Sequence, residues 1–119
     1  MTTVIAYVLP ILPGRSESAG DFGGALDRAG LRHRYEELNQ RADIRRHIEL
    51  VQSLPSGDVL IVVFETGAPE RLARSFEDND YDNWWRARLR ENNGIDPAAG
   101  GVLPAVTWSW TPQDAGSMG

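Results

Sequence analysis

The chain has 119 residues, 41% of them hydrophobic and 24% charged, which is typical of a single globular domain. Its net charge of -5 and pI near 4.9 argue against the concentrated basic surface that nucleic-acid binding requires, so we expect no nucleic-acid partner. All 12 basic residues are arginine and no cysteine occurs, which excludes lysine Schiff bases, disulfides, thiolate nucleophiles and zinc sites built from cysteine.

The first 42 residues predict one strand and two short helices. Residues 4–9 are apolar without alternation, which is typical of a strand buried on both faces. A helix is expected from Ser16, with Gly30 ending or kinking it, and the apolar positions 31, 35, 38 and 42 predict a second helix. The N-terminus has no basic segment or cleavage site and no apolar run could cross a bilayer. We therefore expect a cytoplasmic protein without a membrane partner.

The middle of the chain predicts an antiparallel hairpin. Ile48 and Leu50 alternate with polar neighbours from residue 44 onward, as in a half-buried strand. The turn residues 55–58 then precede the apolar run 59–64. A connection this short between two strand-like runs favours direct antiparallel pairing.

The last part of the chain predicts two helices and a strand. Pro69 begins one helix. The next helix has Tyr81, Trp85 and Leu89 on one face and ends at Gly94 with a left-handed cap. Alternating residues 106–110 predict the final strand. We therefore expect one domain over residues 1–110 and a frayed tail over 111–119.

The order of these elements is typical of a ferredoxin-like α+β fold, βαββαβ, with a four-stranded antiparallel sheet and helices on one face. The first and third strands carry apolar residues on both sides. A sheet face without helices should otherwise be polar, so this pattern predicts that a second copy of the chain covers it in a homodimer.

Residues 81–96, YDNWWRARLRENNGID, resemble the aromatic, arginine-rich helix followed by Gly-Ile/Val-Asp in a family of small uncharacterised bacterial proteins. That family is similar in architecture to the dimeric α/β barrels, which include antibiotic-biosynthesis monooxygenases and polyketide cyclases. The resemblance implies a dimeric α/β barrel with a cavity inside the sheet or between sheet and helices. It implies no mechanism, because relatives of this architecture differ in chemistry.

His47 and Glu49 are the first candidates for catalysis. They lie two apart on the second strand and so share one face, opposite Ile48 and Leu50. If Ile48 and Leu50 face the helices, the pair faces the barrel interior, where the histidine could act as a general base and Tyr7 could donate to a ligand carbonyl. The alternatives are an interface or edge pair for His47 and Glu49, and a core tyrosine for Tyr7.

Large aromatic side chains are the candidates for binding a planar organic ligand. Trp84 and Trp110 are better placed to touch a ligand or partner, whereas helix and strand spacing favours packing for Trp85 and Trp108. The remaining candidate is Tyr81.

The other polar features carry less chemistry. The two histidines lack the spacing of a metal site, so no metal or other cofactor is expected. The glycines of residues 20–24 lack the order of a dinucleotide-binding motif, and they either permit close helix packing or loosen the helix into a lid.

Two functions fit these features. One is a cofactor-independent cyclase, isomerase or monooxygenase acting on an aromatic or polyketide-like metabolite. The other is a non-catalytic ligand-binding or assembly module.

Overall fold

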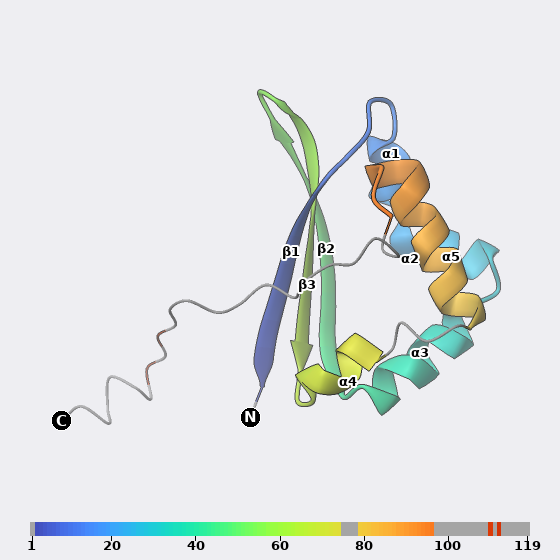
Figure 1. Ribbon diagram of the computed structural model, residues 1–119, viewed down its shortest axis with the longest axis vertical. Coiled ribbons are helices and arrows are strands. Elements are labelled where there is room, and N and C mark those ends of the chain that lie inside the picture. Colours follow the sequence, from blue (N-terminus) through green and yellow to red (C-terminus); the bar gives the residue numbers. More distant parts are fainter. Residues whose placement is uncertain (1, 75–78, 97–109, 111, 113–119) are drawn as a thin grey trace.

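The computed structural model describes residues 2–74, 79–96, 110 and 112, and these form an α+β fold in which helices cover one face of a three-stranded antiparallel sheet (Figure 1). The elements are, in chain order, β1 (Thr3–Pro10), α1 (Ser16–Ala19), α2 (Phe22–Arg28), α3 (Arg32–Arg41), β2 (Ile44–Leu54), β3 (Gly57–Thr66), α4 (Pro69–Arg74), α5 (Asp80–Arg88) and the π-helix η1 (Leu89–Asn93). The predicted last strand, except Trp110, and nearly all of the tail lie outside the described residues.

The sheet has the strand order β1-β3-β2. The predicted hairpin is confirmed, because β2 and β3 pair antiparallel from Leu54 and Gly57 at the turn to Ile44 and Thr66 at the far end. Gly57 has a φ of +129°, a conformation that side chains disfavour. β1 pairs antiparallel with the other edge of β3, which therefore lies at the centre.

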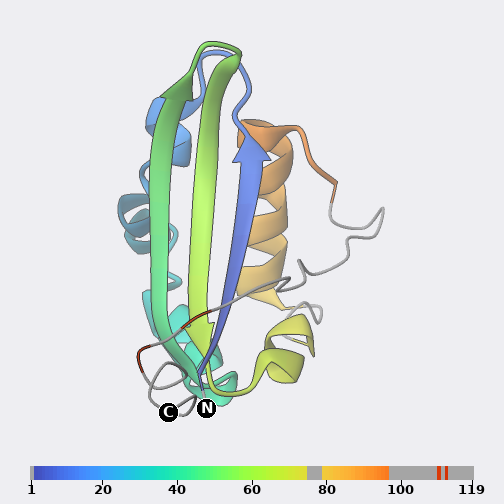
Figure 2. The same ribbon diagram turned by 90° about the vertical axis from the view of Figure 1, so that its left-hand side faces the viewer.

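The two faces of the sheet differ in what covers them. Ile5, Leu60 and Val62 lie on the helix side and are at most 6% exposed. Val8 and Leu50 lie on the other face and are 66% and 51% exposed. Within the described residues no helix covers this second face of β1, which we call the uncovered face and which is turned to the viewer in Figure 2, so its burial under a second copy stays a prediction.

Three helical segments follow β1, where two were expected. α1 ends at Gly20, and Gly30, with a φ of +71°, separates α2 from α3 as predicted. α1, α2 and α5 lie on the same side of the sheet (Figure 1). They close a core that contains Ile11, Ala19 and Leu26.

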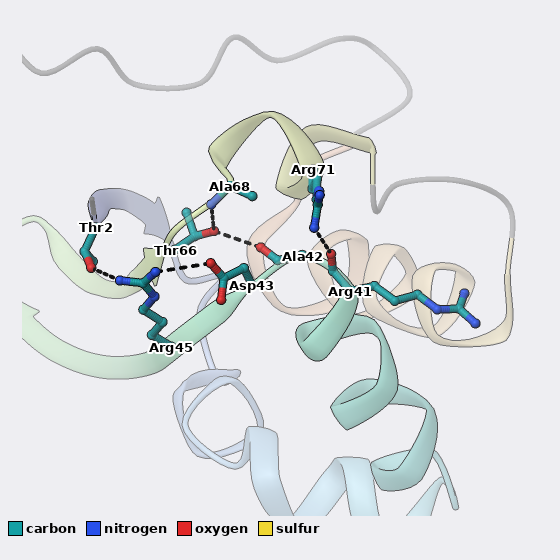
Figure 3. Close-up of polar contacts among 8 residues, drawn as sticks. All are labelled: Thr2, Arg41, Ala42, Asp43, Arg45, Thr66, Ala68 and Arg71. Carbon is teal, nitrogen blue, oxygen red and sulfur yellow. Dashed lines mark hydrogen bonds and ion pairs between the residues drawn. The ribbon is translucent and has the colours of Figure 1, made fainter.

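One buried hydroxyl joins the end of β3 to the turn before β2 (Figure 3). Thr66 is fully buried; its Oγ1 donates to the Ala42 carbonyl at 2.9 Å and accepts from the Ala68 amide at 3.0 Å. These bonds satisfy two backbone groups at the junction of α3, β2 and α4. The orientation of the hairpin relative to α3 is thereby set.

The end of α5 is anchored to the segment after β1. η1 brings two largely buried asparagines inward: Asn93 Nδ2 donates to the Pro10 carbonyl at 2.8 Å, and Asn92 Oδ1 accepts from Arg15 Nε at 3.0 Å. Gly94 follows with a φ of +66°, which confirms the predicted left-handed cap. Among the described residues, no helix has the length and apolar character to cross a membrane.

Candidate functional site

Three side chains form a continuous hydrogen-bonded chain between the sheet and the helices. The Tyr35 hydroxyl, from α3, lies 2.6 Å from Nδ1 of His47 on β2. Nε2 of His47 lies 3.0 Å from Oε2 of Glu49, two residues along the same strand. The side chains of His47 and Glu49 are only 7% and 14% exposed. We call these three residues the relay.

The direction of the two hydrogen bonds follows from the chemistry of the groups. An ionised carboxylate only accepts, so Nε2 of His47 carries the proton that is donated to Glu49. In a neutral imidazole the other nitrogen is then an acceptor, and the Tyr35 hydroxyl donates to Nδ1. The order hydroxyl, imidazole, carboxylate is that of a catalytic triad with a phenol in place of serine.

Aromatic rings enclose the imidazole of His47. The Phe64 ring, on β3, stacks on it with centroids 4.5 Å apart, and the Phe22 ring meets it edge-on at 5.1 Å. Tyr81 and Trp84 of α5 extend the cluster, at 5.5 Å from Tyr35 and 5.6 Å from Phe22 respectively. These contacts hold the imidazole in one orientation and leave its side chain only 7% exposed.

A hollow of about 270 Å³ lies beside the relay. All three relay residues line it, together with Gly20, Phe22, Gly23, Leu26 and Arg32. This volume is close to the lower end of the range for pockets that bind small organic ligands. We refer to it below as the hollow.

A second, much smaller space of about 20 Å³ lies between the sheet and α5. Glu49 and Phe22 line both spaces, and Trp85 and Arg88 line only the smaller one. Its volume suits one water molecule, not an organic ligand. Of these two spaces, the hollow is the one whose volume approaches that of a small-ligand pocket.

Burial shifts the pKa values of several groups around the relay. It is the largest cause that raises the pKa of the Tyr35 phenol above its ordinary value, and it also raises the pKa of Tyr81. Burial lowers the pKa of Arg88, whose Nη2 donates to the Ser18 carbonyl at 2.9 Å. The phenol of Tyr35 is therefore neutral at physiological pH and holds its proton toward His47.

The structure corrects the expected orientation of His47 and Glu49. Both side chains lie on the helix side of the sheet, where His47 is paired with Phe64 and Glu49 with Val62. Ile48 and Leu50 lie on the uncovered face instead. The reason is that aromatic side chains on α2 and α3 supply partners for His47, so the polar pair is buried and the aliphatic pair is not.

Tyr7 lies on the helix side of β1 but is not part of the relay. Its partner in the ladder is Val62, which in turn lies opposite Glu49, so one full strand separates the two side chains. Tyr7 packs against the buried cluster of Ile11, Leu60 and Val62. Its catalytic role stays a prediction that this arrangement does not favour.

The predicted aromatic set is divided among several places. Tyr81 and Trp84 belong to the cluster around the relay, whereas Trp85 lines the smaller space. Trp110 is 56% exposed, and Trp108 lies outside the described residues. Tyr81 and Trp84 are thus connected to the relay through ring contacts.

Tyr35 is the member of the relay that sequence reasoning missed. Its position in the apolar repeat of residues 31–42 indicated a packing role. The signal that could have found it is chemical: a histidine on a buried strand face needs a partner for each ring nitrogen, and Glu49 supplies only one. The nearest tyrosine on the preceding helix is Tyr35.

Within the described residues, no group of three or more acidic or histidine side chains gathers in a way that could hold a metal ion. The site therefore rests on hydrogen bonds and aromatic contacts. Comparisons with protein-family models, curated proteins and solved structures give no match, so the family resemblance of residues 81–96 stays a prediction.

Proposed function

We propose that the chain is a cofactor-independent enzyme that starts its reaction by removing a proton from an aromatic or polyketide-like metabolite bound in the hollow. The observation that carries this proposal is the unbroken relay, whose outer member, Tyr35, lines a space of about 270 Å³ together with His47 and Glu49. A buried acid–base chain next to such a space is typical of enzymes.

Two proton transfers through the relay would remove one proton from the ligand. An acidic C–H proton of the ligand passes to the Tyr35 oxygen while the phenol proton passes to Nδ1 of His47. The products of this step are an enolate in the hollow and an imidazolium beside the Glu49 carboxylate, which stabilises it. Reprotonation at another carbon gives an isomerase, and attack on a carbonyl gives a cyclase. Reaction with dioxygen gives a monooxygenase when a CH2 group of the substrate becomes a carbonyl and the second oxygen atom leaves as water with the two hydrogens of that group.

Deuterium exchange tests this function without knowledge of the natural substrate. The probe is 2-tetralone, a two-ring ketone with an acidic carbon, and NMR in D2O measures loss of its α-proton signal. We expect the protein to accelerate exchange and Tyr35→Phe to reduce the acceleration about 100-fold, since general base catalysis contributes on that order. Exchange by Tyr35→Phe at the wild-type rate contradicts the assigned role.

Tyr7→Phe is the matched control, because it removes the same hydroxyl from a residue on the same side of the sheet but outside the relay. We expect it to leave exchange within twofold of wild type. If Tyr7→Phe abolishes exchange and Tyr35→Phe does not, the sequence-based choice of Tyr7 is right and the relay is only structural.

The uncovered sheet face supports a second candidate, an assembly module that dimerises through its sheet. Two rows of apolar residues cross all three strands there: Val8, Ile61 and Leu50 form one, and Ala6, Val63 and Ile48 the other. Monomers rarely expose so continuous an apolar surface. A second copy of the chain in a ferredoxin-like dimeric barrel, with a fourth strand beside β1, would cover it.

The assembly module and the enzyme would form the same dimer, but only the enzyme would use the hollow to bind a ligand. The enzyme needs ligand access to Tyr35, whereas the assembly module needs only the apolar face. Val8→Glu should disrupt dimerisation while leaving the relay on the opposite side of the sheet intact, so an enzyme would keep its deuterium exchange whereas an assembly module would lose its only function. A variant that stays dimeric would count against the proposed interface.

A further inference from the structure

Gly23 is the described glycine whose presence the backbone and the packing explain least. Gly14, Gly30, Gly57 and Gly94 have positive φ values, which glycine adopts without strain. At Gly20, Gly24 and Gly67 a Cβ atom would approach a neighbouring atom within 3.3 Å, and within 2.4 Å at the last two. Gly23 has neither feature.

A Cβ atom at Gly23 would meet only Arg32 Nη2, at 3.7 Å, which is an ordinary van der Waals distance. Gly23 also lies within α2, where glycine is less favourable than alanine because it loses more conformational freedom on folding. Folding alone would thus favour alanine at this position.

The hollow offers a reason for glycine at position 23. Both Gly23 and Arg32 line it, so a side chain at position 23 would project along its wall toward Arg32. Tyr35 and His47 line the same space. A larger residue at position 23 would thus reduce the room next to the reactive hydroxyl without touching the relay.

We propose that Gly23 determines ligand size: its missing side chain leaves room in the hollow for a ligand of two fused rings, with a phenol or enolisable ketone directed at Tyr35, and a branched side chain at position 23 would take up part of that room. The proposal rests on the proposed function, since it assumes that the hollow binds the substrate. It adds the substrate class and a specificity-determining residue that takes no part in proton transfer.

The test compares one-ring and two-ring probes on wild type, Gly23→Ala and Gly23→Val. Binding of 2-naphthol and of phenol is followed by the tryptophan fluorescence of the intact chain. We expect Gly23→Val to weaken 2-naphthol binding at least tenfold and phenol binding less than threefold. Gly23→Ala should weaken 2-naphthol binding by a smaller factor while raising the unfolding midpoint by about 2–5 °C.

Ala29→Val is the control, because Ala29 is exposed at the end of the same helix and does not line the hollow. It should change neither affinity. If Gly23→Val binds both probes as wild type does, Gly23 does not set ligand size, although the relay and its proposed function survive. If wild type binds neither probe, the proposed function fails and the size rule fails with it.

Discussion

A double-mutant cycle on Tyr35 and His47 measures the hydrogen bond on which the relay depends. Tyr35→Phe removes only the hydroxyl and so creates no cavity, but it leaves Nδ1 of a histidine whose side chain is 7% exposed without its donor. An unsatisfied buried acceptor costs about 1–3 kcal/mol of unfolding free energy. In the His47→Leu background that acceptor is absent, so the same tyrosine change should cost much less.

The expected coupling between the two changes is therefore about 1–2 kcal/mol, obtained from urea unfolding of wild type, the two single variants and the double variant. The matched control is the pair Tyr7→Phe and His47→Leu, which lie on different strands with β3 between them and should be additive. Additivity of Tyr35→Phe and His47→Leu to within about 0.5 kcal/mol would refute the hydrogen bond.

Three further predictions concern the fold around the site. Thr66→Val keeps the side-chain shape but removes the hydrogen-bond partner of two buried backbone groups. Urea unfolding should therefore show a free energy of unfolding lower by about 2–4 kcal/mol. A decrease below about 0.5 kcal/mol would contradict the role of the hydroxyl. Ser16 Oγ donates to Asp58 at 2.5 Å and lowers the pKa of that carboxyl below its ordinary 3.8. The stabilisation is therefore complete above that value and is lost as the pH falls through the lower folded-state pKa. Ser16→Ala should accordingly be less stable than wild type at neutral pH and approach it in acid, and a difference that persists unchanged in acid would contradict the bond. Light scattering should show that Val8→Glu converts a dimer to a monomer. The reason is that residue 8, 66% exposed in the single chain, would place a charge inside the proposed interface. A wild-type protein that is itself monomeric would contradict the proposed interface.

The hairpin and the helix caps could be predicted because they depend on neighbours in sequence. The short turn between Leu54 and Gly57 makes β2 and β3 direct antiparallel neighbours, and Gly94 permits a left-handed end to the α5–η1 segment. The separation of α2 from α3 at Gly30 follows the same local rule. In each of these places the backbone conformation is set by a few adjacent residues.

The site could be predicted only in part, because its contacts join distant segments. Strand spacing places His47 and Glu49 on one face, but whether that face meets helices or a second copy depends on Phe22 and Tyr35, which belong to other elements. The π-helix that turns Asn92 inward also has no sequence signal in its apolar repeat.

The most direct test of the relay is the nitrogen NMR spectrum of the His47 imidazole. With only two histidines in the chain, His47→Leu assigns its signals without ambiguity. The relay predicts a ring with a proton on Nε2, which faces Glu49, and an acceptor Nδ1 whose signal moves in Tyr35→Phe. A ring protonated on Nδ1 instead, or an Nδ1 signal that Tyr35→Phe leaves in place, would contradict the proton arrangement on which the proposed function depends.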